Sequence, residues 1–123
     1  MSAPLQIAQR VADGIAVFEL SGHLVFDEGD RIFSDQVKAF AAAGGRRLIV
    51  DLSRVTYVDS GGIGSLVEMY LHLVRRGGQL KILRPSTAAR RVLQITQLDT
   101  VLETFEEDEQ AIRSFGARAM RAG

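Results

Sequence analysis

One serine stands where its side chain could take part in chemistry. Ser60 lies in the segment YVDSGGIG, residues 57–64, between an apolar run with strand composition at 48–52 and a helical pattern from about Gly62 to Arg76. A hydroxyl group at such a strand-to-helix junction is exposed, and glycines beside it let the backbone of another protein approach closely. Because the N-terminal end of a helix accommodates a phosphate group, Ser60 is a candidate phosphorylation site.

The same segment has a structural interpretation and a nucleotide-binding one. Ser60 could act only as the N-cap of the helix, a role worth about 1 kcal/mol, and the residues alone favour this role. Glycine-rich loops also bind nucleotide phosphates, but no lysine follows Gly61, Gly62 and Gly64 as it does in a phosphate-binding loop. The sequence therefore leaves the cap and the modification site open and argues against a nucleotide site.

A serine hydrolase is the remaining chemistry to consider, because Asp51, Asp59 and Ser60 are expected near one another and the chain has two histidines. The nucleophile of such enzymes sits in a Gly-x-Ser-x-Gly turn, whereas Val58 occupies the first glycine position here. His72 lies about three turns farther along the same helix, too far away to activate the serine. We predict that the protein is not an enzyme, with no catalytic residue, cofactor or metal site.

The helix after the serine has two different faces on a helical wheel. At about 100° per residue, one broad arc carries Ile63, Leu66, Val67, Tyr70, Leu73 and Val74. The other carries Ser65, Glu68, His72, Arg75 and Arg76. Met69 falls on the polar side, so we interpret it either as a partly covered surface residue or as a flexible contact in an interface with a partner protein.

The other elements follow from periodicity and turn signals. Strands are expected at 7–12, 15–21, 48–52 with an extension through 55–58, 80–83 and 101–105, and helices at about 30–43, 62–76, 86–95 and after the acidic run 106–109. Asp13-Gly14 is a strong hairpin signal, and strand–helix–strand units require parallel pairing. We predict an α/β fold, a single small domain at residues 1–116 with a mostly parallel mixed β-sheet of about five strands and about four packed helices. Residues 117–123 are expected to fray.

Composition limits the partners and the compartment. A formal net charge of +0 provides no broad attraction to nucleic acid or to an anionic membrane, so neither is an expected partner. The chain has no cysteine, which excludes disulfides and fits a reducing compartment. No stretch approaches the roughly 20 apolar residues of a membrane-spanning helix, and no secretion signal opens the chain. We therefore expect a cytoplasmic protein without direct membrane insertion.

Four segments in this order resemble the STAS domain, in particular the single-domain bacterial anti-sigma factor antagonists. They are LIVDLS at 48–53, VTYVDSGGIG at 55–64, GGQLKI at 77–82 and VLQITQLD at 92–99, with Phe105-Glu106 at the end of the match. The resemblance covers nearly the whole chain and implies the same fold. The chain departs from the family pattern with Gly61 in place of Ser or Thr, Val25 in place of an acidic residue, and Gln97 in place of Gly.

The resemblance implies a regulatory cycle. In this family, the serine at the position of Ser60 is phosphorylated by a partner that is both an anti-sigma factor and a serine kinase. The unphosphorylated protein binds that partner and releases the sigma factor, and a PP2C-type phosphatase restores the active form. For this chain, the resemblance implies a partner-binding surface at Asp59, Ser60, Gly61, Gly62, Ser65, Met69 and His72. The alternative is a STAS interaction subunit of a signalling assembly or lipid-transport complex, which binds its partner without phosphorylation.

Overall fold

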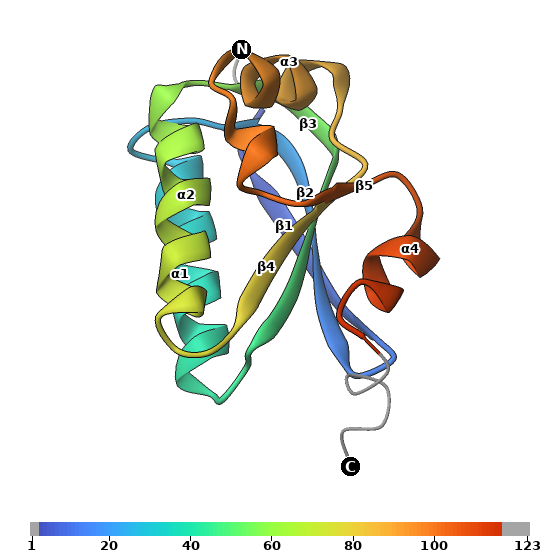
Figure 1. Cartoon of the computed structure of the whole chain (residues 1–123). Coiled ribbons are helices and arrows are strands. Elements are labelled where there is room, and N and C mark those ends of the chain that lie inside the picture. The colour runs from blue at the N-terminus through green and yellow to red at the C-terminus, as the bar shows by residue number, and fades with distance from the viewer. Residues whose placement is uncertain (1–2, 117–123) are drawn as a thin grey trace.

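The computed structural model describes residues 3–116 and contains one five-stranded sheet with the strand order β1-β2-β3-β4-β5. The strands are β1 (Gln6–Ala12), β2 (Ile15–Leu24), β3 (Arg47–Val58), β4 (Gln79–Leu83) and β5 (Thr104–Phe105). β1 is antiparallel to β2, and every other neighbouring pair is parallel (Figure 1). The expected tail at 117–123 lies outside the described residues.

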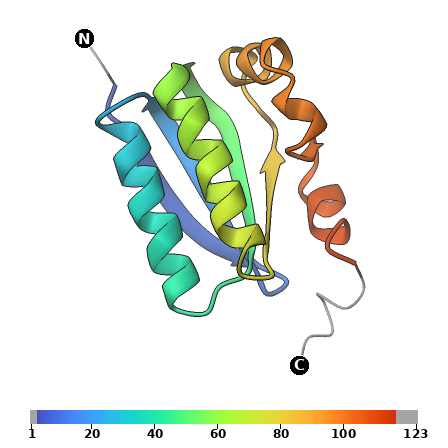
Figure 2. The same cartoon turned by 60° about the vertical axis from the view of Figure 1, so that its left-hand side comes forward.

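Four α-helices connect and flank the strands: α1 (Gly29–Ala42), α2 (Ser60–Val74), α3 (Thr87–Ile95) and α4 (Asp108–Arg113), with a short 3₁₀ helix at Leu98–Thr100. Helices α1 and α2 lie side by side over one face of the sheet, while α4 lies on the opposite side (Figures 1 and 2). The predicted α/β fold, with a mostly parallel mixed sheet and four packed helices, is confirmed. The sequence did not assign the helices to faces of the sheet, and the structure does.

Two separate groups of buried apolar side chains hold these layers together. The larger group lies between the sheet and α1, α2 and α3, and it includes Phe18 and Leu20 of β2. The smaller group lies under α4 and includes Ile15 and Val17 of the same strand. Since neighbouring residues of β2 enter the core on opposite faces of the sheet, β2 is an internal strand, as its apolar composition predicted.

The hairpin between β1 and β2 follows from two residues. Asp13 and Gly14 both have positive φ angles, 52° and 79°, and Ala12 pairs with Ile15 directly across the turn. A two-residue turn with positive φ at both positions has the twist that antiparallel strands require, and Asp-Gly supplies it with little strain. The hairpin prediction is confirmed.

The pairing of β2 with β3 contains two irregularities. Between Glu19 and Ser21 of β2, the opposite segment from Asp51 to Arg54 has one extra residue, and a second extra residue, Thr56, follows opposite the Gly22–His23 step. The Asp51 carboxylate accepts a hydrogen bond from the Ser53 N–H, 2.9 Å, at the first bulge. Such bulges turn a strand locally. In the structure β2 continues past the expected end at residue 21 to Leu24, and β3 is one strand through both bulges.

Charged groups attach α4 to the sheet. Asp108 pairs with Arg10 of β1 at 2.9 Å and with Arg84, which follows β4, at 2.8 Å. Burial alone would raise the pKa of Asp108, but these two guanidinium groups outweigh it and hold that pKa below its ordinary value. Lys81 of β4 is buried, and its ammonium group donates to the Ser114 carbonyl and hydroxyl oxygens at 3.0 and 2.9 Å. Asp108 of the acidic run at 106–109 therefore contributes specific ion pairs in addition to a favourable helix start.

Candidate functional site

Ser60 is the first residue of α2, and its side chain is exposed. The N-cap of the helix is the preceding residue, Asp59, whose Oδ1 accepts a hydrogen bond from the Gly62 N–H at 2.9 Å. The interpretation of Ser60 as the N-cap is therefore wrong by one position. Both residue types cap helices well, and the extended backbone of Asp59, φ −106° and ψ −174°, places its carboxylate over the first turn.

The carboxylate of Asp59 has a second structural role. Its two oxygens also accept hydrogen bonds from the Phe26 N–H, at 3.0 and 3.1 Å, and the Asp59 N–H donates to the Leu24 carbonyl oxygen at 3.4 Å. One side chain thus fastens the loop after β2 to the start of α2. Asp59 was predicted to bind a partner, and the structure shows its carboxylate occupied by contacts within the chain.

The two glycines after Ser60 are required by close packing within this protein. A Cβ atom on Gly61 would lie 2.5 Å from the Phe26 Cβ, and one on Gly62 would overlap the Leu24 carbonyl oxygen. Real Cβ atoms do not approach other atoms so closely, so the loop after β2 can lie against α2 only where side chains are absent. Gly62 is buried, and its predicted place on a partner-binding surface is wrong. Gly61 is half-buried beside Ser60.

Two further residues of the predicted surface are inside the protein. Met69 is fully buried, and Ser65 is 5% exposed with its hydroxyl donating to the Gly62 carbonyl oxygen at 2.7 Å. Both expectations for Met69, a surface residue or an interface contact, are wrong. The helix wheel placed the apolar centre near Ile63, but α1 packs beside α2 and covers the flank with Ser65 and Met69. The buried stripe is consequently rotated by about a quarter turn.

His72 is half-buried near the C-terminal end of α2, about 18 Å along the helix from Ser60 at the standard rise per residue. Burial, followed by the positive charges of Arg76, Lys38 and Arg75, lowers the pKa of His72 below its ordinary value. The imidazole is therefore neutral at pH 7. The structure does not bring His72 to Ser60, in agreement with the sequence argument against an activated serine.

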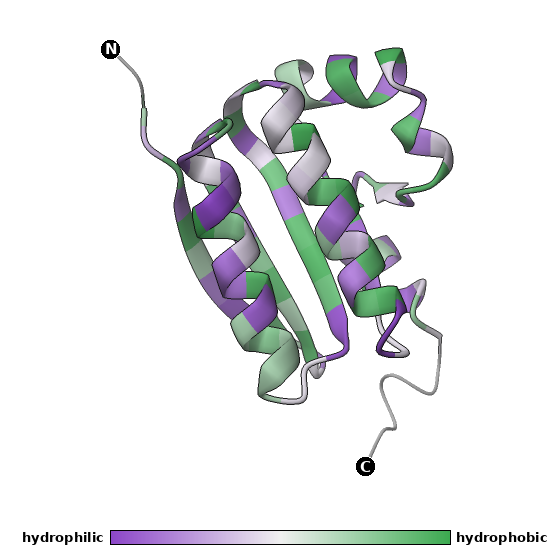
Figure 3. Cartoon of the chain, turned by 90° about the vertical axis from the view of Figure 1, so that its left-hand side faces the viewer, coloured by the Kyte–Doolittle hydropathy of each residue, from purple (hydrophilic) through white to green (hydrophobic). Residues whose placement is uncertain are grey.

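A shallow groove between α1 and α2 starts beside Ser60. Its volume is about 520 Å³, and its walls are Phe26, Asp30, Arg31, Ser34, Asp35, Lys38, Gly61, Gly64, Ser65 and Glu68. Figure 3 looks onto these two helices, and hydrophilic segments recur along both. At the Ser60 end, the Phe26 ring is 70% exposed directly over Gly61. This combination of an exposed aromatic ring, a free serine and a charged groove is suited to binding a protein surface.

Sequence reasoning did not identify Phe26. The residue belongs to no strand or helix, so neither period that marks core positions applies to it. The available signal was Phe26 at the end of the apolar run Leu24-Val25-Phe26, immediately before the acidic pair Asp27 and Glu28. Exposed loop residues of this kind are frequent in binding sites.

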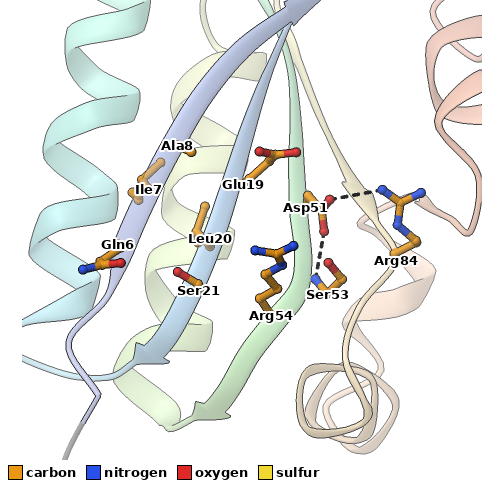
Figure 4. A pocket seen from close by; sticks show the side chains of 10 residues that line it. All are labelled: Gln6, Ile7, Ala8, Glu19, Leu20, Ser21, Asp51, Ser53, Arg54 and Arg84. Atoms are coloured by element: carbon orange, nitrogen blue, oxygen red, sulfur yellow. Dashed lines mark hydrogen bonds and ion pairs between the residues drawn. The ribbon is translucent and has the colours of Figure 1, made fainter.

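A second hollow, of about 610 Å³, lies on the other face of the sheet, away from α1 and α2 (Figure 4). There the Asp51 carboxylate accepts a hydrogen bond from Arg84 at 3.3 Å. Its charged lining residues are two carboxylates, Glu19 and Asp51, and two guanidinium groups, Arg54 and Arg84. Their charges balance, so the hollow favours neither an anionic nor a cationic ligand. Asp51 belongs to this face, and the expected grouping with Asp59 and Ser60 is not formed.

Comparison with known proteins gives the family. The model of the STAS domain family matches residues 6–111, which is most of the chain. The protein belongs to the STAS domain family. Gln97, where the sequence departs from the expected glycine, has a left-handed backbone with φ 61°, a conformation that glycine adopts without strain.

Three relatives illustrate the kinship of this STAS domain. It is 20% identical to an anti-sigma F factor antagonist of Paenibacillus polymyxa, over 88% of this chain and 92% of the relative. It is 26% identical to an anti-sigma-B factor antagonist of Listeria monocytogenes, over 84% of this chain and 89% of the relative. The crystal structure of an anti-sigma factor antagonist from Mycobacterium paratuberculosis superposes with a TM-score of 0.77 at 25% identity, covering 93% of this chain and 97% of that one.

The described part of this STAS domain, residues 3–116, contains no cluster of three or more histidine, cysteine, aspartate or glutamate side chains able to hold a metal ion. Within the same residues, each helix is too short or too polar to cross a membrane.

Proposed function

We propose that this STAS domain is an anti-sigma factor antagonist controlled by phosphorylation of Ser60. In the unphosphorylated form it binds an anti-sigma factor that has serine kinase activity, and the sigma factor is released. The kinase modifies Ser60 and ends the complex, and a PP2C-type phosphatase reverses the modification. The two relatives described above are anti-sigma factor antagonists, and the similarity covers nearly their whole length, which supports this role.

The main support for the proposal is that Asp59 and Ser60 have separate roles. Asp59 supplies the helix cap and the link to Phe26, so the fold does not depend on the Ser60 hydroxyl. The serine is exposed at the positive end of a helix of 15 residues, where added negative charge is favourable. A phosphate at this position leaves the fold intact, and its effect falls on the bound partner.

The charges around Ser60 make the effect of phosphate on binding large. A phosphoserine adds about −1.5 to −2 charges at pH 7, next to the carboxylate of Asp59 and at one end of a groove with three carboxylates, Asp30, Asp35 and Glu68, and two cations, Arg31 and Lys38. A partner surface that fits the unmodified groove must then accommodate the added charge and the bulk of the phosphate group. A loss of about 3 kcal/mol lowers affinity by more than 10²-fold, and no conformational change in this protein is needed.

One observation supports the alternative of a constitutive interaction subunit. Gly61 replaces the Ser or Thr expected beside the modified serine, and the Phe26 backbone and Cβ lie against it, which leaves no room for a side chain. A surface built around an exposed Phe26 ring binds a partner without any modification step. The two functions share the same residues and differ in whether Ser60 is phosphorylated.

The first experiment is mass spectrometry of the intact protein and its peptides, purified from its own cells with and without stress. A phosphate on Ser60 whose occupancy changes with the condition is expected. Tagged wild type and the variants Ser60→Ala, Ser60→Asp and Gln94→Glu are then compared for the partner that co-purifies. Gln94→Glu adds one negative charge at an exposed position of α3 and serves as the matched control.

The switch predicts that Ser60→Asp loses the partner while Ser60→Ala and Gln94→Glu retain it. Equal retention by all variants, together with an unmodified Ser60 under every condition, would refute the switch and establish the constitutive subunit. Equal loss in both Ser60 variants would show that the hydroxyl group itself is a contact, which also contradicts the proposed cycle.

A further inference from the structure

The C-terminal half of β3 has a strand partner on one side only. β4 pairs with β3 from Arg47 to Asp51, whereas β2 on the other side pairs with it as far as Val58. Beyond the hydrogen bond from the Ser86 N–H to the Leu52 carbonyl oxygen, 3.1 Å, no strand within the described residues continues along this edge. Residues 53–58 therefore present backbone groups without a strand partner, over about 20 Å at the rise of an extended chain.

A groove runs along this free edge. It has a volume of about 630 Å³ and lies between β3 and α3. In Figure 1, α3 is beside the upper end of β3. Its walls are residues 53–58 of β3 together with Ser86, Thr87, Ala88, Arg91 and Val92. The volume is within the range of about 300–1,000 Å³ that binding sites occupy.

The lining of the groove combines apolar and positively charged side chains. Val92 is half-buried and Val55 beneath it is only 1% exposed. Tyr57 is 54% exposed, and its ring stands edge-on against His23 with the ring centroids 5.7 Å apart. Arg54 and Arg91 are the charged lining residues of the groove, whose walls within residues 3–116 include no carboxylate, and Arg54 also lines the hollow of Figure 4 together with Glu19 and Asp51. Neither arginine forms an ion pair with any residue in the described range 3–116.

The first turn of α3 adds to the positive potential. Ser86 caps this helix through its hydroxyl, which accepts from the Ala89 N–H at 3.1 Å, and Thr87 and Ala88 of the first turn face the groove. The backbone N–H groups at the start of a helix favour negative charge nearby. Carboxylates in the groove would thus meet two guanidinium groups and a helix N-terminus.

We propose that this groove binds an extended acidic segment of a partner protein, which adds a strand to the edge of β3. Edge strands with unpaired backbone groups are templates for such addition, and alternate side chains of the added strand provide specificity. The backbone of the segment pairs with β3, its apolar side chains contact Val92 and Tyr57, and its carboxylates face Arg54 and Arg91. The surface does not include Ser60 and does not depend on the proposed phosphorylation cycle.

The test uses a fluorescein-labelled octapeptide of alternating glutamate and valine, with an octapeptide of alternating lysine and valine as its control. Fluorescence anisotropy measures the Kd of each peptide for the full chain. We expect the acidic peptide to bind and the basic one to bind at least tenfold more weakly. Arg54→Glu and Arg91→Glu are each expected to weaken the acidic peptide by about fivefold or more, since each loses an ion pair and gains a repulsion.

Arg113→Glu, an exposed charge reversal on α4, is the matched control and should leave the Kd unchanged. Circular dichroism and thermal unfolding verify that all three variants are folded. Amide hydrogen exchange then locates the peptide: about half of the amides at 53–58, those directed toward the groove, should exchange more slowly in the complex.

Three results would overturn the proposal. The first is equal binding of both peptides, and the second is a Kd that neither arginine reversal changes. The third is amide exchange at 53–58 that becomes slower as the concentration of the protein alone is raised. The edge would then pair with a second copy of the chain.

Discussion

Replacing Asp59 by alanine tests whether one side chain joins the β2–α1 loop to the start of α2. The substitution removes the N-cap bond to Gly62, worth about 1 kcal/mol. It also removes the charge-assisted hydrogen bonds to the Phe26 N–H. Such bonds contribute about 1.5–3 kcal/mol each when buried, and the lower value applies because Phe26 is exposed and water replaces part of the bond. Together the loss is about 2–3 kcal/mol.

Urea unfolding followed by circular dichroism measures this loss, which for a domain of this size lowers Tm by roughly 10 °C. Asp59→Asn is the informative companion, because an amide oxygen at the Oδ1 position still accepts from both N–H groups, and its loss should be about 1 kcal/mol. Asp35→Ala, which removes an exposed carboxylate from α1, should change stability by about 0.5 kcal/mol or less. If Asp59→Ala unfolds at the wild-type urea concentration, the assigned link between loop and helix is wrong.

Three further predictions concern the core and the charges. Met69→Glu places an unpaired carboxylate at a fully buried position and should lower the free energy of unfolding in urea by about 3–5 kcal/mol. Met69→Leu keeps the volume and should lower it by less than about 1.5 kcal/mol. A wild-type Tm for Met69→Glu would contradict the burial of this residue. Gly62→Ala should destabilise the protein by about 3 kcal/mol or more, because the new Cβ would clash with the Leu24 carbonyl oxygen. Gly64→Ala has open space around its Cβ and should stabilise the protein by about 0.5–1 kcal/mol. Thermal unfolding of both variants compares the two effects. Because the pKa of Asp108 is depressed in the folded protein, its ion pairs contribute stability above the ordinary carboxyl pKa, and this stability is lost as the pH falls through the lower folded value. In urea unfolding at stepped pH, the stability difference between wild type and Asp108→Asn should therefore shrink below about pH 4. A difference that is constant with pH would refute the assignment.

Most of the fold could be predicted because its signals are local. Asp13-Gly14 determines a hairpin by backbone conformation alone, and the apolar runs around Val17 and Ile49 identify internal strands without knowledge of their neighbours. The last strand was expected over 101–105 but is only Thr104–Phe105, because the 3₁₀ helix at Leu98–Thr100 is followed by a turn and a bend over 101–103. Propensity does not distinguish a short strand from a turn in such a segment.

The site was predicted less well, since its geometry depends on contacts between distant segments. A helical wheel ranks residues by hydropathy, so it could not show that α1 would cover the Met69 side of α2. Asp59 and Ser60 are equally good caps by residue type, and only the tertiary bond to Phe26 decides between them. The position of Ser60 at the start of α2 was predictable because a strand-to-helix junction with glycines is recognisable in the sequence.

The two bulges of β3 have a consequence for how the length of this strand can change in evolution. Closing the bulge at residues 52–53, or the one at Thr56, removes a residue while the later side chains keep their faces, with Val58 inside and Tyr57 outside. A deletion within 48–51, where the pairing is regular, turns every following side chain to the wrong face instead. Homologous chains with a β3 shorter by one residue should therefore have lost it at a bulge, and the segment before Asp51 should keep its length.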